Sequence, residues 1–265
     1  CERWGGFFTT RIWVELSQNY FTEDLGVNWQ DEYFIWDCAA GTGNLLTGLT
    51  NKYNIYASTF DQSDANVMHE RIDHGANLLH NHVFQFDFLN DDFTKLPQSL
   101  QDIINDKEKR KKLIIYINPP YAEHGNRATF AGEGEHKSSV ANTSKIYAKF
   151  SKTVGTATRE LFAQFFLRVH EEIPDCHLAS FSTLKFVNSQ NFLKYRQYFK
   201  GEYKKGFICK ANTFDNVKGN FPIGFLIWDL SKKTEIKKVE TDVVNENSEF
   251  IGLKNFYAFG SKDFI

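Results

Sequence analysis

The sequence predicts an α/β fold: a mostly parallel sheet with helices on both faces and an antiparallel hairpin near its end. Three observations predict it. Short apolar runs recur and end at polar residues, as parallel strands do where a ligand binds at their carboxyl ends. A glycine turn follows the first run. The run Leu113 to Ile117 is continuous enough for a buried strand.

The first half of the chain predicts four strands in series. They cover 33–36, 54–60, 83–86 and 113–117, and they end at Asp37, Asp61, Asp87 and Asn118. A turn containing Gly41 and Gly43 follows the first strand, and a helix is predicted over 45–49. Glycine permits backbone conformations and a close approach to a ligand that a side chain would block. The turn is therefore interpreted as a cofactor loop, with too few glycines in its spacing for the dinucleotide fingerprint.

The remaining elements complete the α/β pattern. In the second half, an amphipathic helix over 159–172 precedes a fifth strand over 177–182. A further helix is predicted over 189–199, and residues 221–228 form part of the terminal hairpin.

The tetrapeptide Asn118-Pro119-Pro120-Tyr121 is the most informative motif. The carboxamide oxygen of Asn118 and the carbonyl of Pro119 are two acceptors for the hydrogens of a planar exocyclic amine. Proline has a fixed φ and no N–H, so its carbonyl is held rigidly. The ring of Tyr121 offers a face for stacking. This arrangement indicates methyl transfer to a planar nitrogen.

The acids at the strand ends predict how a nucleoside-containing donor binds. Asp61 is placed for the two ribose hydroxyls, and Gln62 follows it over the adenine face. Asp87 could accept from the adenine amine while Phe88 packs on the ring.

These residues resemble the S-adenosylmethionine-dependent DNA adenine-N6 methyltransferases of restriction-modification systems, from about Phe7 to about Leu230. The resemblance implies a Rossmann-like, seven-stranded methyltransferase fold. It also implies that the motif 118–121 holds the target base, which is flipped out of the DNA duplex. The donor residues that it implies are Thr9, Asp37, Ala39, Gly41, Gly43, Asp61, Gln62, Asp87, Phe88 and Asn118. Thr9 is placed at the donor carboxylate, although the proline that often follows this threonine in the family is missing.

Other residues are candidates for contact with the substrate. In the family an aromatic residue near the terminal hairpin stacks on the second face of the flipped base, and Phe214 and Phe221 are the candidates here. The polar stretch 122–158 contains Lys145 and several glycines, and it could close over an extruded nucleotide or be disordered.

Several alternatives remain open from the sequence. A protein glutamine-N5 methyltransferase or an RNA amino methyltransferase would use the same acceptors on a planar amide or base. Cytosine N4 is another possible target. A function of a different class is a non-catalytic, donor-binding module of a defence assembly.

Composition sets the remaining expectations. The 265 residues, 42% of them hydrophobic, suffice for one catalytic domain over 1–230, followed by an extension over 231–265 that leads to a missing region. The four cysteines have no metal or disulfide spacing, and no apolar run is long enough for a bilayer, so a cytoplasmic protein without a metal site is expected. The net charge of −2 suggests that a region or partner subunit outside this chain reads the DNA sequence.

Overall fold

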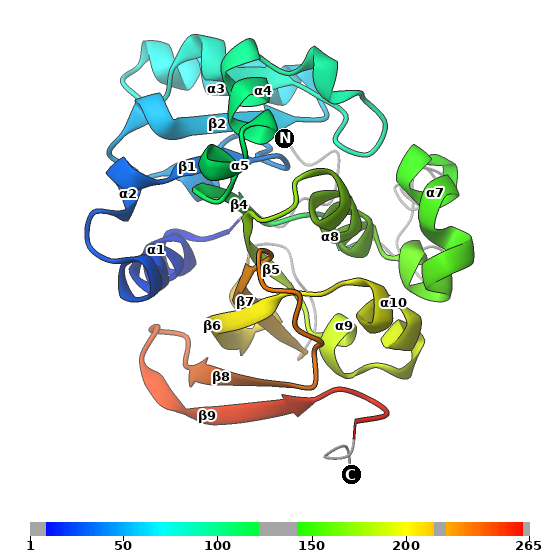
Figure 1. Ribbon diagram of the computed structural model, residues 1–265. Coiled ribbons are helices and arrows are strands. Elements are labelled where there is room, and N and C mark those ends of the chain that lie inside the picture. The colour runs from blue at the N-terminus through cyan, green and yellow to red at the C-terminus, as the bar shows by residue number, and fades with distance from the viewer. Residues whose placement is uncertain (1–8, 122–141, 215–220, 262–265) are drawn as a thin grey trace, which may run out of the picture.

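The structure is a computed structural model that describes residues 9–121, 142–214 and 221–261. Its strands form one sheet in the order β3-β2-β1-β4-β5-β7-β6-β8-β9 (Figure 1). The strands are β1 (Phe34–Asp37), β2 (Ile55–Thr59), β3 (Val83–Gln85), β4 (Leu113–Ile117), β5 (His177–Thr183), β6 (Glu202–Lys210), β7 (Pro222–Asp229), β8 (Lys238–Val244) and β9 (Phe250–Tyr257). The first five strands pair in parallel, as predicted.

The sheet has nine strands in the described part of the chain, so the expected number of seven was wrong. The predicted hairpin is confirmed: β7 pairs antiparallel with β5 on one side and with β6 on the other. The two additional strands, β8 and β9, form a second antiparallel hairpin, and β8 runs parallel to β6. Strand β8 is attached to helix α1 (Arg11–Leu25) because the hydroxyl of Tyr20 donates to the carboxylate of Asp242.

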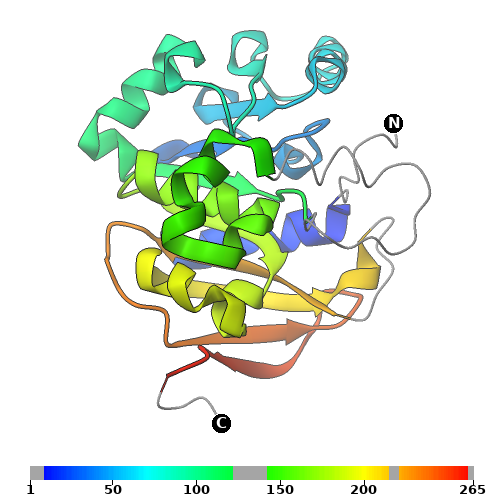
Figure 2. The ribbon, with the colours of Figure 1, turned by 90° about the vertical axis from the view of Figure 1, so that its right-hand side faces the viewer.

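Helices cover both faces of the sheet, as Figures 1 and 2 show. Helices α1, α2 (Trp29–Glu32) and α3 (Gln62–Asp73) contribute to the core on one face. The other face packs against α4 (Gln98–Asn105), α7 (Lys145–Val154), α8 (Leu161–Glu172), α9 (Lys185–Asn188) and α10 (Leu193–Tyr198). The short helix α5 (Lys107–Arg110) precedes β4.

Strand β4 shows why the sheet needs both layers. Its five residues are all buried, and they alternate between the two cores. Ile114 and Tyr116 point into the core beneath α1, whereas Ile115 and Ile117 point into the core beneath α8. A strand with apolar residues on both faces is stable only between two helical layers.

The glycine turn and the polar stretch differ from their predicted conformations. The helix expected over 45–49 is only a 3₁₀ turn at Asn44–Leu46, because Gly48 takes a left-handed conformation at φ +87° that a right-handed helix excludes. In the stretch 122–158, residues 145–154 form α7, which Ser144 caps by accepting from the N–H of Tyr147 at 2.9 Å. Residues 122–141, which include the glycines expected to let the stretch close, lie outside the described residues.

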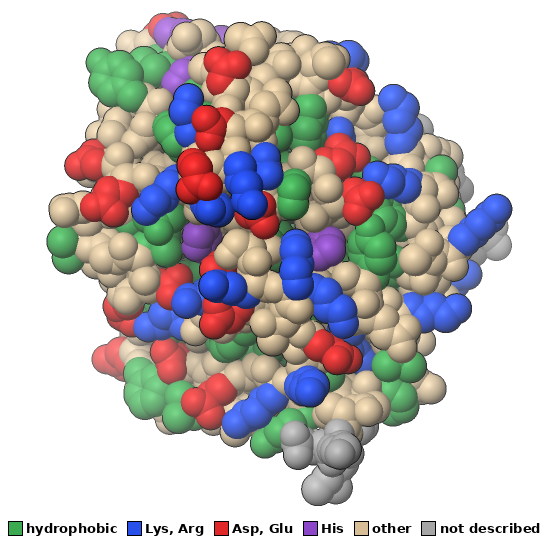
Figure 3. Space-filling view, viewed as in Figure 1, with side chains coloured by type: hydrophobic (Ala, Val, Ile, Leu, Met, Phe, Trp, Pro, Cys, Tyr) green, Lys and Arg blue, Asp and Glu red, His purple; other side chains and the backbone are tan. Residues whose placement is uncertain are grey.

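The helix expected over 189–199 is divided in two. A 3₁₀ turn covers Gln190–Phe192, and α10 follows it over Leu193–Tyr198. On the surface shown in Figure 3, basic and acidic side chains are interspersed over most of the face. Within the described ranges, no helix is both long enough and apolar enough to cross a membrane.

One carboxyl group is enclosed in the sheet at the point where the glycine turn begins. Asp37 is the last residue of β1 and is 1% exposed. Its Oδ1 accepts a hydrogen bond from the N–H of Ala39 at 3.0 Å, which orients the first residues of the loop. Burial raises the pKa of Asp37 to about 8, and the bond from Ala39 offsets this only in part.

We therefore expect Asp37 to make the free energy of unfolding depend on pH. Its pKa in the folded protein lies above the value near 4 of an unfolded chain, so its contribution is fully present below about pH 4 and is lost as the pH rises to about 8. The slope should reach at most about 1.4 kcal/mol per pH unit. Urea unfolding between pH 4 and pH 9 measures it in the wild type and in Asp37→Asn, which keeps an acceptor for Ala39. Parallel curves for the two proteins would contradict this expectation.

Candidate functional site

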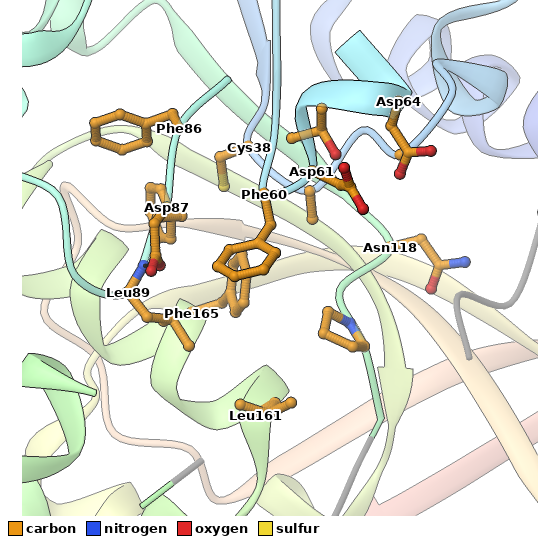
Figure 4. A pocket seen from close by; sticks show the side chains of 15 residues that line it. Cys38, Phe60, Asp61, Asp64, Phe86, Asp87, Leu89, Asn118, Leu161 and Phe165 are labelled. Atoms are coloured by element: carbon orange, nitrogen blue, oxygen red, sulfur yellow. Dashed lines mark hydrogen bonds between the residues drawn. The ribbon is translucent and has the colours of Figure 1, made fainter. Parts of the chain in front are cut away.

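A pocket opens at the edge of the sheet where β1, β2, β3 and β4 end (Figure 4). Its volume is about 980 Å³, including the open solvent at its mouth. The predicted site residues that line it are Ala39, Gly41, Asp61, Asp87, Phe88, Asn118 and Pro120. The order of the strands changes direction between β1 and β4, and crevices at such switch points are the usual ligand sites of open α/β sheets.

The two glycines of the loop have different roles. A Cβ atom at Gly41 would have no heavy atom within 4 Å, and Gly41 lines the pocket, so a ligand can approach its backbone closely. Gly43 does not line the pocket. It has a φ of +85°, and a Cβ atom there would lie 3.2 Å from the sulfur of Met68, so Gly43 allows close packing against α3. Arg71 of α3 donates to the carbonyl of Thr42 at 2.6 Å and holds the loop in place.

The end of β2 brings two carboxylates to the pocket. Asp61 caps α3: its Oδ1 accepts from the N–H and the hydroxyl of Ser63, both at 2.9 Å. Asp64, one turn into α3, lines the same pocket, and its pKa is raised by burial and by the nearby charge of Asp61. Gln62 is exposed, does not line the pocket and donates to Asn66. Instead the half-exposed ring of Phe60 lies between Asp61 and Asp87 in the view of Figure 4.

The residues that follow β3 form one wall of the pocket, and hydrogen bonds within this segment fix its conformation. Oδ1 of Asp87 accepts from the N–H of Leu89 at 3.0 Å, and Oδ2 accepts from the side-chain amide of Asn90 at 2.7 Å. The side-chain oxygen of Asn90, Oδ1, accepts from the backbone N–H of Lys145 at 2.9 Å. Asn90 therefore links the acid at the pocket to the first residue of α7.

Arg168 of α8 supports this wall from behind and is only 4% exposed. Its guanidinium donates to the carbonyl of Phe88 and, at 2.7 Å, to the carbonyl of Asp91. It also lies 4.3 Å from the ring centroid of Phe93 and 5.2 Å from that of Phe88. Phe88 stacks in parallel on Phe165 with 5.1 Å between ring centroids. A planar guanidinium can bind two carbonyls and stack on rings at once, which the ammonium group of lysine cannot do.

Asn118 stands immediately after β4, and both ends of its side-chain amide are hydrogen-bonded. Nδ2 donates to Oγ1 of Thr9 at 2.8 Å, and Oδ1 accepts from the hydroxyl of Tyr121. Tyr121 does not line the pocket; its ring packs against the core beneath α1. Burial, and next the nearby thiol of Cys209, raise the pKa of the Tyr121 hydroxyl far above its usual value. The hydroxyl therefore stays protonated and able to donate.

The structure does not bring every predicted site residue to the pocket. Phe214 is 3% exposed and packs between Trp13 and Phe181, so it does not present a face for stacking. Phe221 is 41% exposed just before β7, and Lys145 is exposed at the start of α7. The predicted site residues outside the lining are Thr9, Asp37, Gly43, Gln62, Pro119, Tyr121, Lys145, Phe214 and Phe221.

Sequence reasoning missed part of the lining. Phe60 and Asp64 lie within three residues of Asp61 in the sequence, so their proximity to this predicted site residue could have identified them. Leu161 and Phe165 of α8 could not be identified in this way, because they enter the pocket from the far side and lie more than forty residues after Asn118. Four residues apart on a helix, they share one face. No group of three or more potential metal ligands occurs among residues 9–121, 142–214 and 221–261.

No protein-family model matches the sequence, and no curated protein matches it. Solved structures do match. A complex of DrdV with DNA superposes with a TM-score of 0.62 and 16% identity, over 97% of this chain and 30% of the solved chain. The methyltransferase subunit of a type I restriction-modification system from Streptococcus thermophilus gives 0.60 and 17%, over 97% and 51%. A putative class I S-adenosylmethionine-dependent methyltransferase from Listeria monocytogenes gives 0.55 and 13%, over 90% and 65%.

This chain spans less than two thirds of the length of each of these three solved chains. At below 20% identity, the likeness is one of fold. The chain therefore has the fold that these solved chains share.

Proposed function

We propose that this chain is the catalytic core of a DNA methyltransferase. It transfers a methyl group from S-adenosylmethionine to the N6 atom of an adenine flipped out of the duplex, as part of a restriction-modification enzyme. The observation that carries the proposal is that Asn118, at the end of β4, lines the same pocket as Asp61 and Asp87. An acceptor for a planar amine thus lies beside a site with the chemistry to hold a nucleoside.

The residues of the pocket fit the donor. Gly41 leaves room for the donor beside the loop, and the carboxylate of Asp61 is suited to ribose hydroxyls. Phe60 and Phe88 offer apolar surface for an adenine ring, and Asp87 is an acceptor at that end of the pocket. Asp61 and Asp64 place negative charge where a positively charged sulfonium compound is bound.

The residues around Asn118 then orient the target. Oδ1 of Asn118 and the carbonyl of Pro119 accept the two hydrogens of the adenine amine, and the amine displaces the Tyr121 hydroxyl from Oδ1. The ring of Tyr121 leaves the core to stack on the base, and stacking and hydrogen bonds offset the few kcal/mol that extrusion costs. The bound donor supplies an activated methyl group with its own leaving group. Catalysis by the chain is therefore mainly positioning.

DNA is preferred as the acceptor because solved structures with this fold include a complex of DrdV with DNA and the restriction-modification enzyme LlaBIII bound to DNA. We assign catalysis to residues 1–230. Residues 231–265, which supply β8 and β9, form an extension, and the base sequence is recognised by a region or partner subunit outside this chain. The solved chains are longer than this one, which supports recognition of the base sequence by a region outside it.

A labelled-methyl assay tests the proposal with three acceptors: unmethylated bacterial DNA, RNA and a glutamine-containing protein extract. Label in N6-methyladenine of the DNA is the expected result. Label in N4-methylcytosine would show that the target base is cytosine. Label only in RNA or in protein glutamine would refute DNA as the acceptor. Donor binding without transfer to any of the three would favour a non-catalytic binding module.

The variant Asn118→Ala should lower turnover at least about 100-fold, because it removes an acceptor that aligns the amine in the transition state. Affinity for S-adenosylmethionine, measured by calorimetry, should change by less than about threefold, since the acids of the donor site remain. Asn105→Ala, at the exposed end of α4, is the matched control. Turnover near the wild-type rate in Asn118→Ala would exclude the assigned role.

Asp61 has two roles, which two substitutions can separate. Asp61→Asn keeps an oxygen that caps α3 but loses the charge, so it should weaken donor binding about tenfold with little change in melting temperature. Asp61→Ala should do both: weaken binding and cost about 1 kcal/mol of stability through the lost cap. Asp92→Ala, which removes a similar cap from the 3₁₀ turn Phe93–Lys95, controls for capping alone. If Asp61→Asn binds the donor normally, Asp61 does not hold the ribose.

A further inference from the structure

We propose that Thr9 is a positioning residue: its hydroxyl holds the amide of Asn118 with Oδ1 turned toward the amino group of the target. This inference rests on the proposed function. It departs from the sequence-based expectation that Thr9 contacts the carboxylate of the donor. Thr9 does not line the pocket, and its Oγ1 lies 2.8 Å from Nδ2 of Asn118.

The chemistry of the amide explains why such a partner is needed. The oxygen and nitrogen ends of a carboxamide are nearly equal in size, and the torsion that exchanges them is soft. A target amine can only donate, so it requires Oδ1 and is repelled by Nδ2. When Oδ1 faces the target, Nδ2 must face the opposite side, and there it needs an acceptor. Thr9 is 6% exposed, so water is not a ready substitute for its hydroxyl.

The fold holds Thr9 at the correct place relative to Asn118. Thr9 lies two residues before Arg11, the first residue of α1, and two side-chain contacts fix that helix. The hydroxyls of Ser17 and Tyr116 are hydrogen-bonded at 2.5 Å, and Tyr116 lies in β4, two residues before Asn118. Nε1 of Trp13 donates to Oγ1 of Thr213 at 3.1 Å, which ties α1 to the 3₁₀ turn Ala211–Thr213 that follows β6. Thr9 and Asn118 therefore adjoin α1 and β4, two elements whose relative position is fixed by the bond between Ser17 and Tyr116.

The neighbouring Thr10 provides a matched control. It precedes α1 directly, but it makes no side-chain capping bond, and its Oγ1 has no hydrogen-bond partner within the described ranges. Thr10→Val and Thr9→Val are the same chemical change at adjacent positions. Only Thr9→Val removes an acceptor from Asn118.

The test measures single-turnover methyl transfer to DNA and donor affinity for each variant. Thr9→Val should slow transfer about 10- to 100-fold, because Nδ2 loses the hydroxyl of Thr9 as an acceptor and the amide is held less firmly. Thr9→Ser keeps the hydroxyl and should stay within about threefold of the wild type, as should Thr10→Val. Donor affinity should remain within about twofold in all of them.

Two results would overturn the inference while leaving the proposed function intact. One is a wild-type rate in Thr9→Val when Asn118→Ala is inactive. The other is a loss of donor affinity in Thr9→Val that accounts for the whole loss of rate, because Thr9 would then bind the donor.

A second readout does not depend on turnover and separates this inference from the proposed function. In ¹⁵N-labelled protein, the side-chain amide of Asn118 can be assigned by its loss in Asn118→Ala. Its hydrogens should exchange with solvent more slowly in the wild type and in Thr9→Ser than in Thr9→Val. Equal exchange rates in all three proteins would show that Thr9 does not hold the amide, whatever the acceptor of the methyl group.

Discussion

The parallel pairing of β1 with β4 is the constraint on which the rest of this structure depends. It places the glycine loop, which follows β1, next to Asn118, which follows β4. The chain leaves β1 toward β2 on one side and enters β5 from β4 on the other, so a crevice remains between the two strand ends. Gly41 and Asn118 can therefore line one pocket although they are 77 positions apart in the sequence.

Side chains outside this pocket hold its walls in place. Behind the end of β3, Arg168 holds two backbone carbonyls and stacks on phenylalanine rings, so the segment that carries Asp87 has little freedom. At the glycine loop, Arg71 and the buried Asp37 hold the backbone from its two sides. Such supporting contacts keep the pocket within the small geometric tolerance that the proposed catalysis by positioning requires.

The motif after β4 satisfies its own polar groups in the structure described here. Both ends of the Asn118 amide have partners, and the ring of Tyr121 is packed against the core. A buried polar group without a partner is costly, so an acceptor such as Oδ1 of Asn118 is more stable when a group of the protein itself donates to it. In the proposed reaction the amine of the target replaces the Tyr121 hydroxyl as the donor to Oδ1 of Asn118, while the bond from Nδ2 to Thr9 persists.

The sequence by itself determined strands β1 to β5 and β7, the turn between β1 and β2 and the acids at the strand ends, because these depend on local patterns of apolar residues and glycine. Seven of the predicted site residues line one pocket. Only the tertiary structure decided that α8 closes this pocket with Leu161 and Phe165, that Phe214 is buried in the core, and that β8 and β9 extend the sheet. These features depend on contacts between segments far apart in the chain, and periodicity carries no information about such contacts.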